Sequence, residues 1–180
     1  HPESILSDSP ASFAGYRPGN FDHRYEGELT ARRALQLSRN LPAIELLSMV
    51  GPLRLTKRLE QAGAVLKLSK TAQPGLAIGL GGVGTTLTDL VTLYAGLANG
   101  GEARALRISD SEAFSEPYQM LTPAASWYLA SILSGANTTS AKSPGSLAFK
   151  TGTSYGYRDA WAIGFNGRYV AGIWIGRPDG

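Results

Sequence analysis

The sequence contains no cysteine and only two histidines, His1 and His23. The absence of cysteine excludes disulfides, thiolate catalysis and cysteine-ligated metal sites. A histidine zinc site or a Ser-His-Asp triad would have to use one of the two histidines. We expect both to be plain surface residues, because one begins the chain and the other lies in a polar segment. The sequence therefore predicts no metal and no other cofactor.

Charge and long apolar runs are also scarce. Charged residues make up 17% of the 180 residues, the net charge is +3, and the basic residues are scattered. This pattern predicts no nucleic-acid partner. No apolar run approaches the ~20 residues that span a bilayer, and no signal peptide opens the chain. Any contact with a membrane is therefore expected only through an anchor outside this sequence.

Helical patterns recur along the chain from residue 31 to residue 133. Residues 1–29, which are punctuated by proline and glycine, are expected to form loops. Thr86 and Asp89 have the spacing of a capping box, with Asp in place of the usual Glu. Apolar spacing and capping residues predict helices over Ala31–Ser38, Ala43–Val50, Leu53–Ala62, Leu87–Ala98 and Pro123–Leu133.

The last part of the chain has strand patterns instead. Strands are expected over residues 146–153, 160–165 and 169–175, and Asn166-Gly167 is a strong hairpin signal between the last two. Helices followed by an antiparallel sheet predict an α+β fold. Since no repeat or linker divides the sequence, we expect a single domain over residues 1–180.

Two short motifs carry candidate chemistry. Lys150-Thr151-Gly152-Thr153 lies on a predicted strand, where a glycine often marks the close approach of a ligand or another backbone. The lysine and the two hydroxyls around it can bind a carboxylate. Ser38-Arg39-Asn40 lies between two predicted helices, where Ser and Asn also occur as ordinary capping residues. Ser-x-Asn arises by chance in about half of chains of this size, so the second motif alone has little weight.

In this order the two triplets match the second and third active-site motifs of β-lactamases and penicillin-binding proteins. The surrounding sequence resembles the transpeptidase domain of the class A penicillin-binding proteins over essentially the whole chain. Two segments, Tyr16–Phe21 and Ser154–Trp161, resemble one subgroup of that class in particular. The segments that carry the general resemblance are Ala34–Ala43, Thr86–Gly101, Lys150–Trp161 and Gly172–Gly176.

The resemblance implies a partial β-lactamase/transpeptidase-like fold and acyl transfer on peptidoglycan stem peptides ending in D-Ala-D-Ala. In this reaction a nucleophilic serine of the family forms an acyl-enzyme, and β-lactam antibiotics would acylate that serine. The reaction would take place on the periplasmic side of the inner membrane. Ser38 would pass a proton toward the leaving amine, and Asn40 would orient the substrate amide. We expect these two residues and the strand containing Lys150 to meet in one cleft.

The same resemblance assigns roles to the third motif. Lys150 would bias the site electrostatically toward the substrate carboxylate, and the hydroxyls of Thr151 and Thr153 would donate to it. Gly152 would let the strand approach the substrate, and the Thr153 N–H would form half of an oxyanion hole. Trp161 and Trp174 are expected to pack on the sheet, and Asp159 is expected to anchor the loop after the motif.

One motif of the family is missing, namely the Ser-x-x-Lys that carries the nucleophile. Thr139-Ser140-Ala141-Lys142 is the nearest imitation, and it lies after Ser38, whereas the resemblance implies a nucleophile before it. We therefore expect a C-terminal portion of the domain, without the nucleophile segment, the glycosyltransferase domain and the membrane anchor. Such a chain would be inactive alone.

Two alternatives to a transpeptidase would give the chain a different function. A non-catalytic binding or scaffold module of the same fold would also lack the serine. A β-lactamase would need a deacylating glutamate in a loop between the second and third motifs, and no glutamate of this sequence has a matching context.

Overall fold

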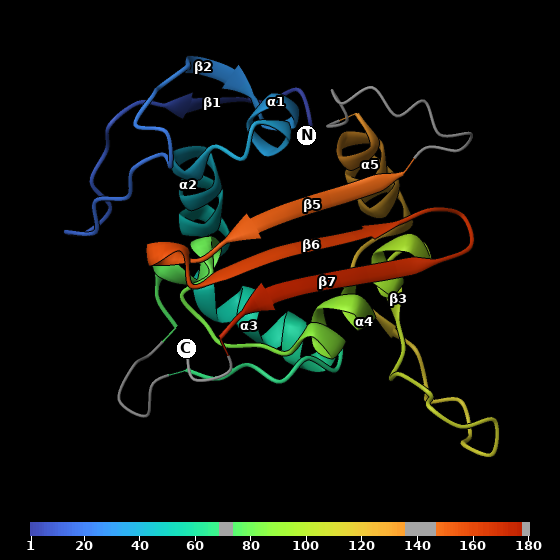
Figure 1. Ribbon diagram of the computed structural model, residues 1–180. Helices are drawn as coiled ribbons and strands as arrows, with labels where there is room; N and C mark the ends of the chain where they lie inside the picture. Colours follow the sequence, from blue (N-terminus) through green and yellow to red (C-terminus); the bar gives the residue numbers. More distant parts are fainter. Residues whose placement is uncertain (69–73, 136–146, 178–180) are drawn as a thin grey trace. The chain divides into compact units, whose positions relative to one another are not determined.

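The computed structural model describes residues 1–68, 74–135 and 147–177 (Figure 1). The chain divides into two compact units, one formed by His1–Thr56 with Leu68–Gly84, and the other by Lys57–Lys67 with Thr85–Gly180. The Ser-x-Asn motif belongs to the first unit and the Lys-Thr-Gly motif to the second. The prediction of one domain over residues 1–180 stays a prediction.

The first unit contains a small antiparallel sheet. Strands β1 (Ile5–Asp8) and β2 (Gly27–Thr30) pair from Ile5 opposite Thr30 to Asp8 opposite Gly27. The expectation that residues 1–29 form only loops is therefore wrong. Leu6 and Leu29 are cross-strand partners and both are buried, but four-residue strands are too short for their alternation to stand out between prolines and glycines.

Three helices follow, namely α1 (Ala31–Gln36), α2 (Asn40–Val50) and α3 (Pro52–Gln61). The predicted helices are confirmed, although α1 ends at Gln36, two residues before the expected end at Ser38, and α2 begins three residues before the expected start at Ala43. Pro42 therefore lies in the first turn, where no N–H has an intrahelical partner. Leu41 and Ile44 of α2 are completely buried, and the 3-10 helix η1 (Leu76–Leu80) packs on the same helix. The boundary between the units falls within α3.

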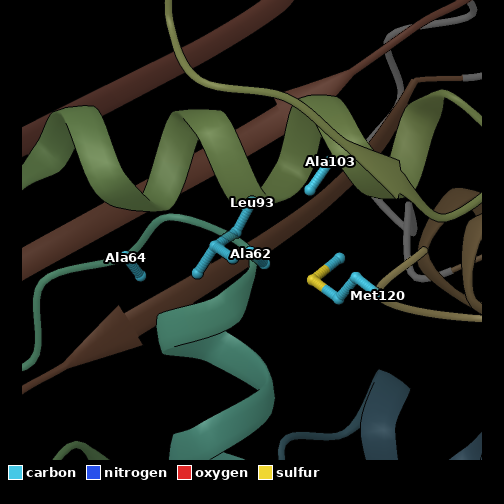
Figure 2. Close-up of a cluster of buried hydrophobic side chains, with 5 residues drawn as sticks. All are labelled: Ala62, Ala64, Leu93, Ala103 and Met120. Carbon is cyan, nitrogen blue, oxygen red and sulfur yellow. The ribbon is translucent and has the colours of Figure 1, made fainter. Parts of the chain in front are cut away.

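In the second unit, α4 (Leu87–Ala98) begins at a complete capping box. The Thr86 hydroxyl accepts from the Asp89 N–H at 3.1 Å, and the Asp89 carboxylate accepts from the Thr86 N–H at 3.1 Å. The sequence prediction is therefore confirmed, Asp included. Strands β3 (Glu102–Ala103) and β4 (Tyr118–Gln119) and helix α5 (Pro123–Ser134) follow. Figure 2 shows side chains from the α3–α4 region meeting those near β3 and β4 in a buried cluster of Ala62, Ala64, Leu93, Ala103 and Met120.

The C-terminal sheet is antiparallel, in the order β5 (Ala148–Thr153), β6 (Asp159–Phe165), β7 (Val170–Gly176). Helices α4 and α5 pack against it, and Ile163 and Phe165 point toward them and are buried. A Cβ on Gly172 would come within 2.6 Å of Val91, so α4 lies directly on β7. The α+β prediction is confirmed.

The hairpin between β6 and β7 turns one residue later than an Asn-Gly loop would. Phe165 pairs with Val170, and the Asn166 N–H donates to the Tyr169 carbonyl at 3.0 Å, so Gly167 and Arg168 lie at the tip. The Asn166 side-chain oxygen accepts from the N–H groups of Arg168 and Tyr169, each at 2.8 Å. The asparagine closes this turn through its side chain, and neither Asn166 nor Gly167 has the positive φ that a type I′ turn requires. Among the described residues, no helix is both long and apolar enough to cross a bilayer.

Candidate functional site

Ser38 lies at the end of α1 in a backbone conformation that serine seldom adopts. Its φ is 56°. Its N–H donates to the Leu35 carbonyl at 3.2 Å, and the next N–H, of Arg39, donates to the Ala34 carbonyl at 2.9 Å. These two bonds define a Schellman motif, in which the left-handed position is usually occupied by glycine. A serine there costs about 1–2 kcal/mol in backbone strain. Strain of this kind is concentrated at functional sites.

Asn40 is the first residue of α2, and its side chain is held by the preceding segment. Its side-chain N–H donates to the Gly19 carbonyl at 2.7 Å, and its backbone N–H donates to the Asn20 side-chain oxygen at 2.8 Å. These bonds fix the orientation of the carboxamide. Among the described residues, no hydrogen bond to its side-chain oxygen is found.

The register of the sheet assigns the residues of the third motif to two faces. Lys150 pairs with Ile163, and Gly152 pairs with Trp161. Cross-strand partners share a face, so Lys150 and Gly152 lie on the face that α4 and α5 cover. Alternate residues of a strand point to opposite faces, so Thr151 and Thr153 lie on the other, exposed face. A ligand that contacts all four residues must therefore lie along the edge of β5.

The edge of β5 presents backbone groups to such a ligand. The Ser154 N–H donates to the Asp159 carbonyl at 3.0 Å, on the side of β6. Since the direction alternates along a strand, the N–H and C=O groups of Thr153 and Thr151 point the other way. No other described strand pairs with β5 on that side. The Lys150 ammonium reaches the same edge, because Nζ donates to the Thr151 carbonyl at 2.9 Å.

Gly152 is not required by the chain's own structure. Its φ is not positive, and an added Cβ would meet only the Trp161 Cβ at 3.9 Å, an ordinary contact. Gly172 differs, because a Cβ there would collide with α4. Neither backbone strain nor packing against the described residues requires a glycine at 152.

The loop after the motif is anchored by Asp159. Its Oδ1 accepts from the Trp174 indole N–H at 2.9 Å, and its N–H donates to the Ser154 hydroxyl at 2.9 Å. Trp161 and Trp174 are cross-strand partners whose ring centroids lie 5.9 Å apart. The two tryptophans therefore pack on the sheet, and Asp159 holds the loop, as expected from the sequence.

Partial burial lowers the pKa of Lys150 from its ordinary value of 10.5. The charged form is disfavoured because the stem of the side chain lies on the helix-covered face, where water is excluded. Lowering the pKa of a lysine increases the fraction that can act as a base or proton acceptor at a given pH.

Sequence reasoning identified the two motifs but missed the residues that support the first of them. Asp8 and Asn20 are buried polar residues that contact Arg39 or Asn40. Asp8 and Asn20 are twelve positions apart in a segment punctuated by proline and glycine, so no local sequence pattern marks them as partners. The spacing between the two motifs in three dimensions stays a prediction, and Thr139-Ser140-Ala141-Lys142 lies outside the described residues.

Comparison with known proteins identifies relatives along the full chain. Penicillin-binding protein 1C of Escherichia coli (strain K12) is 42% identical over 100% of this chain and 24% of that protein. Penicillin-binding protein 1F of Bacillus subtilis (strain 168) is 31% identical over 97% of this chain and 27% of that protein. The chain therefore spans about a quarter of the length of these curated relatives. Penicillin-binding protein 1C is the subgroup that Tyr16–Phe21 and Ser154–Trp161 indicate. No family model matches the chain.

A solved structure shows the same fold. Penicillin-binding protein PonA1 from Mycobacterium tuberculosis superimposes with a TM-score of 0.82 at 20% identity, covering 98% of this chain and 55% of that one. The same protein has been solved in complex with penicillin V. The transpeptidase-like fold expected from the sequence is therefore confirmed.

We expect Ser38→Gly to be more stable to unfolding than Ser38→Ala by about 1 kcal/mol, because only glycine relieves the left-handed strain. Both variants lose the hydroxyl, so their difference isolates the backbone effect. Ser48, exposed within α2, is the matched control, where alanine should be the more stable by about 1 kcal/mol. Denaturant unfolding of the four variants measures both differences. The same order at both positions would contradict the strain at Ser38.

We expect the Lys150 amine to titrate below 10.5 in the folded protein and at its ordinary value after unfolding. The charged form is disfavoured only in the fold, so the free energy of unfolding should rise as the pH rises from the folded toward the unfolded pKa. NMR of methylated lysines, with Lys150→Met to assign the signal, measures the titration. An equal pKa in the folded and unfolded protein would show that the side chain is fully hydrated.

Proposed function

This chain belongs to the class A penicillin-binding proteins, and on that premise we propose that it supplies two of the three motifs of a serine DD-transpeptidase site. The substrate class is the peptidoglycan stem peptide ending in D-Ala-D-Ala. The observation that carries the proposal is the edge of β5. It presents the Thr153 and Thr151 backbone groups, the Lys150 ammonium and a glycine that the fold itself does not need.

In this proposal the stem peptide lies extended along the edge of β5 and pairs with its unpaired backbone groups. The Lys150 ammonium attracts the terminal carboxylate, and the hydroxyls of Thr151 and Thr153 donate to it. The Thr153 N–H donates to the scissile carbonyl oxygen as negative charge develops there. One such donor stabilises the transition state by about 3 kcal/mol in other enzymes.

The chemistry is acyl transfer in two steps. A serine hydroxyl attacks the carbonyl carbon of the penultimate D-alanine, the C–N bond breaks, and the terminal D-alanine leaves as the amine after gaining a proton. An amine of a second stem peptide then attacks the ester and releases the serine. We assign Ser38 to proton transfer toward the leaving amine. Asn40, whose carboxamide is held by its bond to the Gly19 carbonyl, would orient the substrate amide and the lysine beside the nucleophile.

The nucleophile is proposed to come from a Ser-x-x-Lys segment of the intact protein, because the family carries this motif and these 180 residues do not. The active site would then need Ser38 and Asn40 of the first unit beside Lys150 of the second. The expected location is the periplasmic face of the inner membrane, through an anchor in the intact protein. β-Lactams would be the inhibitors, as penicillin V is a ligand of PonA1.

Labelling with a fluorescent penicillin tests this function. We expect the full-length protein to form a stable, stoichiometric adduct, and Lys150→Met to slow its formation by roughly tenfold or more, since the carboxylate loses its counter-charge. The 180-residue chain should not be labelled, because acylation needs the nucleophile, its base and the oxyanion hole together. Failure of the full-length protein to react would instead favour a non-catalytic binding module.

Proximity of the two motifs has its own test, to which these 180 residues contribute no native cysteine. In the full-length protein carrying Ser38→Cys and Lys150→Cys, we expect a bifunctional thiol reagent of about 10 Å span, roughly three hydrogen-bond lengths, to join the two positions. Mass spectrometry of the digest identifies the linked peptides, and the two single-cysteine variants are the controls. If only singly attached reagent is found, the motifs do not share a cleft.

A further inference from the structure

Arg39, the middle residue of the Ser-x-Asn motif, is the centre of a network of carboxylates. Its side chain is only 9% exposed. Its guanidinium donates to Asp22 Oδ1 at 2.9 Å and to Glu26 Oε1 at 2.8 Å, and its Nε lies 3.6 Å from Asp8 Oδ2. The three carboxylates all come from residues 8–26, the segment that precedes the motif.

The buried members of this network also reach Asn40. Asp8 is completely buried, and its Oδ1 accepts from the Asn20 side-chain N–H at 2.7 Å. The same Asn20 nitrogen donates to the Arg24 carbonyl at 2.7 Å, while its oxygen accepts from the Asn40 backbone N–H at 2.8 Å. Asn20 therefore connects a buried carboxylate to the backbone of the third residue of the motif.

Within this network only the Arg39–Asp8 contact is buried on both sides, with side chains 9% and 0% exposed, whereas Asp22 and Glu26 are 44% and 47% exposed. An exposed pair contributes little to stability, whereas removal of one partner from a buried pair leaves a charge without compensation. A buried ion pair gives little net stability over an apolar core, and one of its attested uses is to fix a particular arrangement. What this network fixes is the short segment Ser38–Asn40, which contains the strained serine.

We propose that Arg39, together with Asp8 and Asn20, is a positioning device that fixes the Ser38 backbone and the Asn40 carboxamide in the orientation needed for acyl transfer. The inference rests on the proposed transpeptidase function. A left-handed serine persists only where its surroundings over-determine the conformation. Here the Schellman bonds fix the residue from the side of α1, and the bonds of Arg39 and Asn20 fix it from the side of α2. The middle position of the motif thus acts through its neighbours and touches no substrate.

The test measures acylation of the full-length protein by a fluorescent penicillin, with the initial binding constant separated from the acylation rate constant. We expect Arg39→Met and Asn20→Ala each to lower the rate constant by roughly tenfold to hundredfold, with little change in initial binding, because misplaced groups slow the chemical step. The double variant should lose about as much as the stronger single variant, since both changes break one network. Arg39→Lys, whose single ammonium lacks the planar fork of donors that a guanidinium presents to separate carboxylates, should remain slow.

Arg32→Met is the matched control, because Arg32 lies on the same short helix α1 and forms an exposed ion pair with Glu3 at 2.7 Å. Its rate constant should equal that of the wild type. A merely structural role would lower the labelled fraction or the melting temperature and leave the rate constant of the folded molecules unchanged, and that result would overturn the proposal. Full recovery in Arg39→Lys, or additive losses in the double variant, would also overturn it.

Hydrogen exchange of the full-length protein gives a readout that does not depend on the reaction. We expect Asn20→Ala to increase exchange of the Asn40 amide, whose acceptor it removes, while Arg32→Met leaves that amide protected. Unchanged protection in Asn20→Ala would contradict the network. If the wild type does not react with penicillin at all, the proposed function fails and the positioning role fails with it. If the wild type reacts and the variants react equally fast, only the positioning role fails.

Discussion

The hydrogen-bonded register between β5 and β6 controls what the residues of the second unit can do. It puts Lys150 beside Ile163 on the helix-covered face and directs the Thr153 N–H to the open edge. A slip of one residue would exchange the two faces and turn the Thr153 N–H toward β6. The register is held by burial of Ile163 and Phe165 and by the close approach of α4 at Gly172. Packing on one face of the sheet thereby sets the chemistry available at its edge.

Several residues of the two motifs are not the best choice for stability. Ser38 occupies a position suited to glycine, Gly152 occupies a strand position that any small residue would fill, and Lys150 is partly buried. Each departure costs free energy locally, and the fold compensates for it elsewhere. Natural proteins commonly show such departures at functional sites. These three departures are seen in the structure itself, so they point to the two motifs without relying on the family resemblance.

The two motifs also use different kinds of support. The residues of β5 are placed by backbone pairing and apolar packing, and the useful groups there are largely main-chain atoms. The Ser-x-Asn segment is placed by buried polar contacts from residues 8–26 and by a helix-terminating turn. In the proposed reaction, each kind of support suits what its motif has to do. A strand edge binds an extended peptide, whereas proton transfer depends on the exact placement of a hydroxyl and a carboxamide.

The sequence alone determined the order of helices and sheet, the capping box of α4, the hairpin, the family and the motif residues. These features depend on local spacing, capping and turn chemistry, which are written in neighbouring residues. Only the tertiary structure decided the β1–β2 sheet, the closure of the last hairpin by the Asn166 side chain, the left-handed backbone of Ser38 and the network of Arg39. These depend on partners distant in sequence or on a side chain that replaces a backbone contact. The sequence around Asp8 and Asn20 does not show that the two residues pair, because their need for a polar partner arises only when the fold buries them away from water.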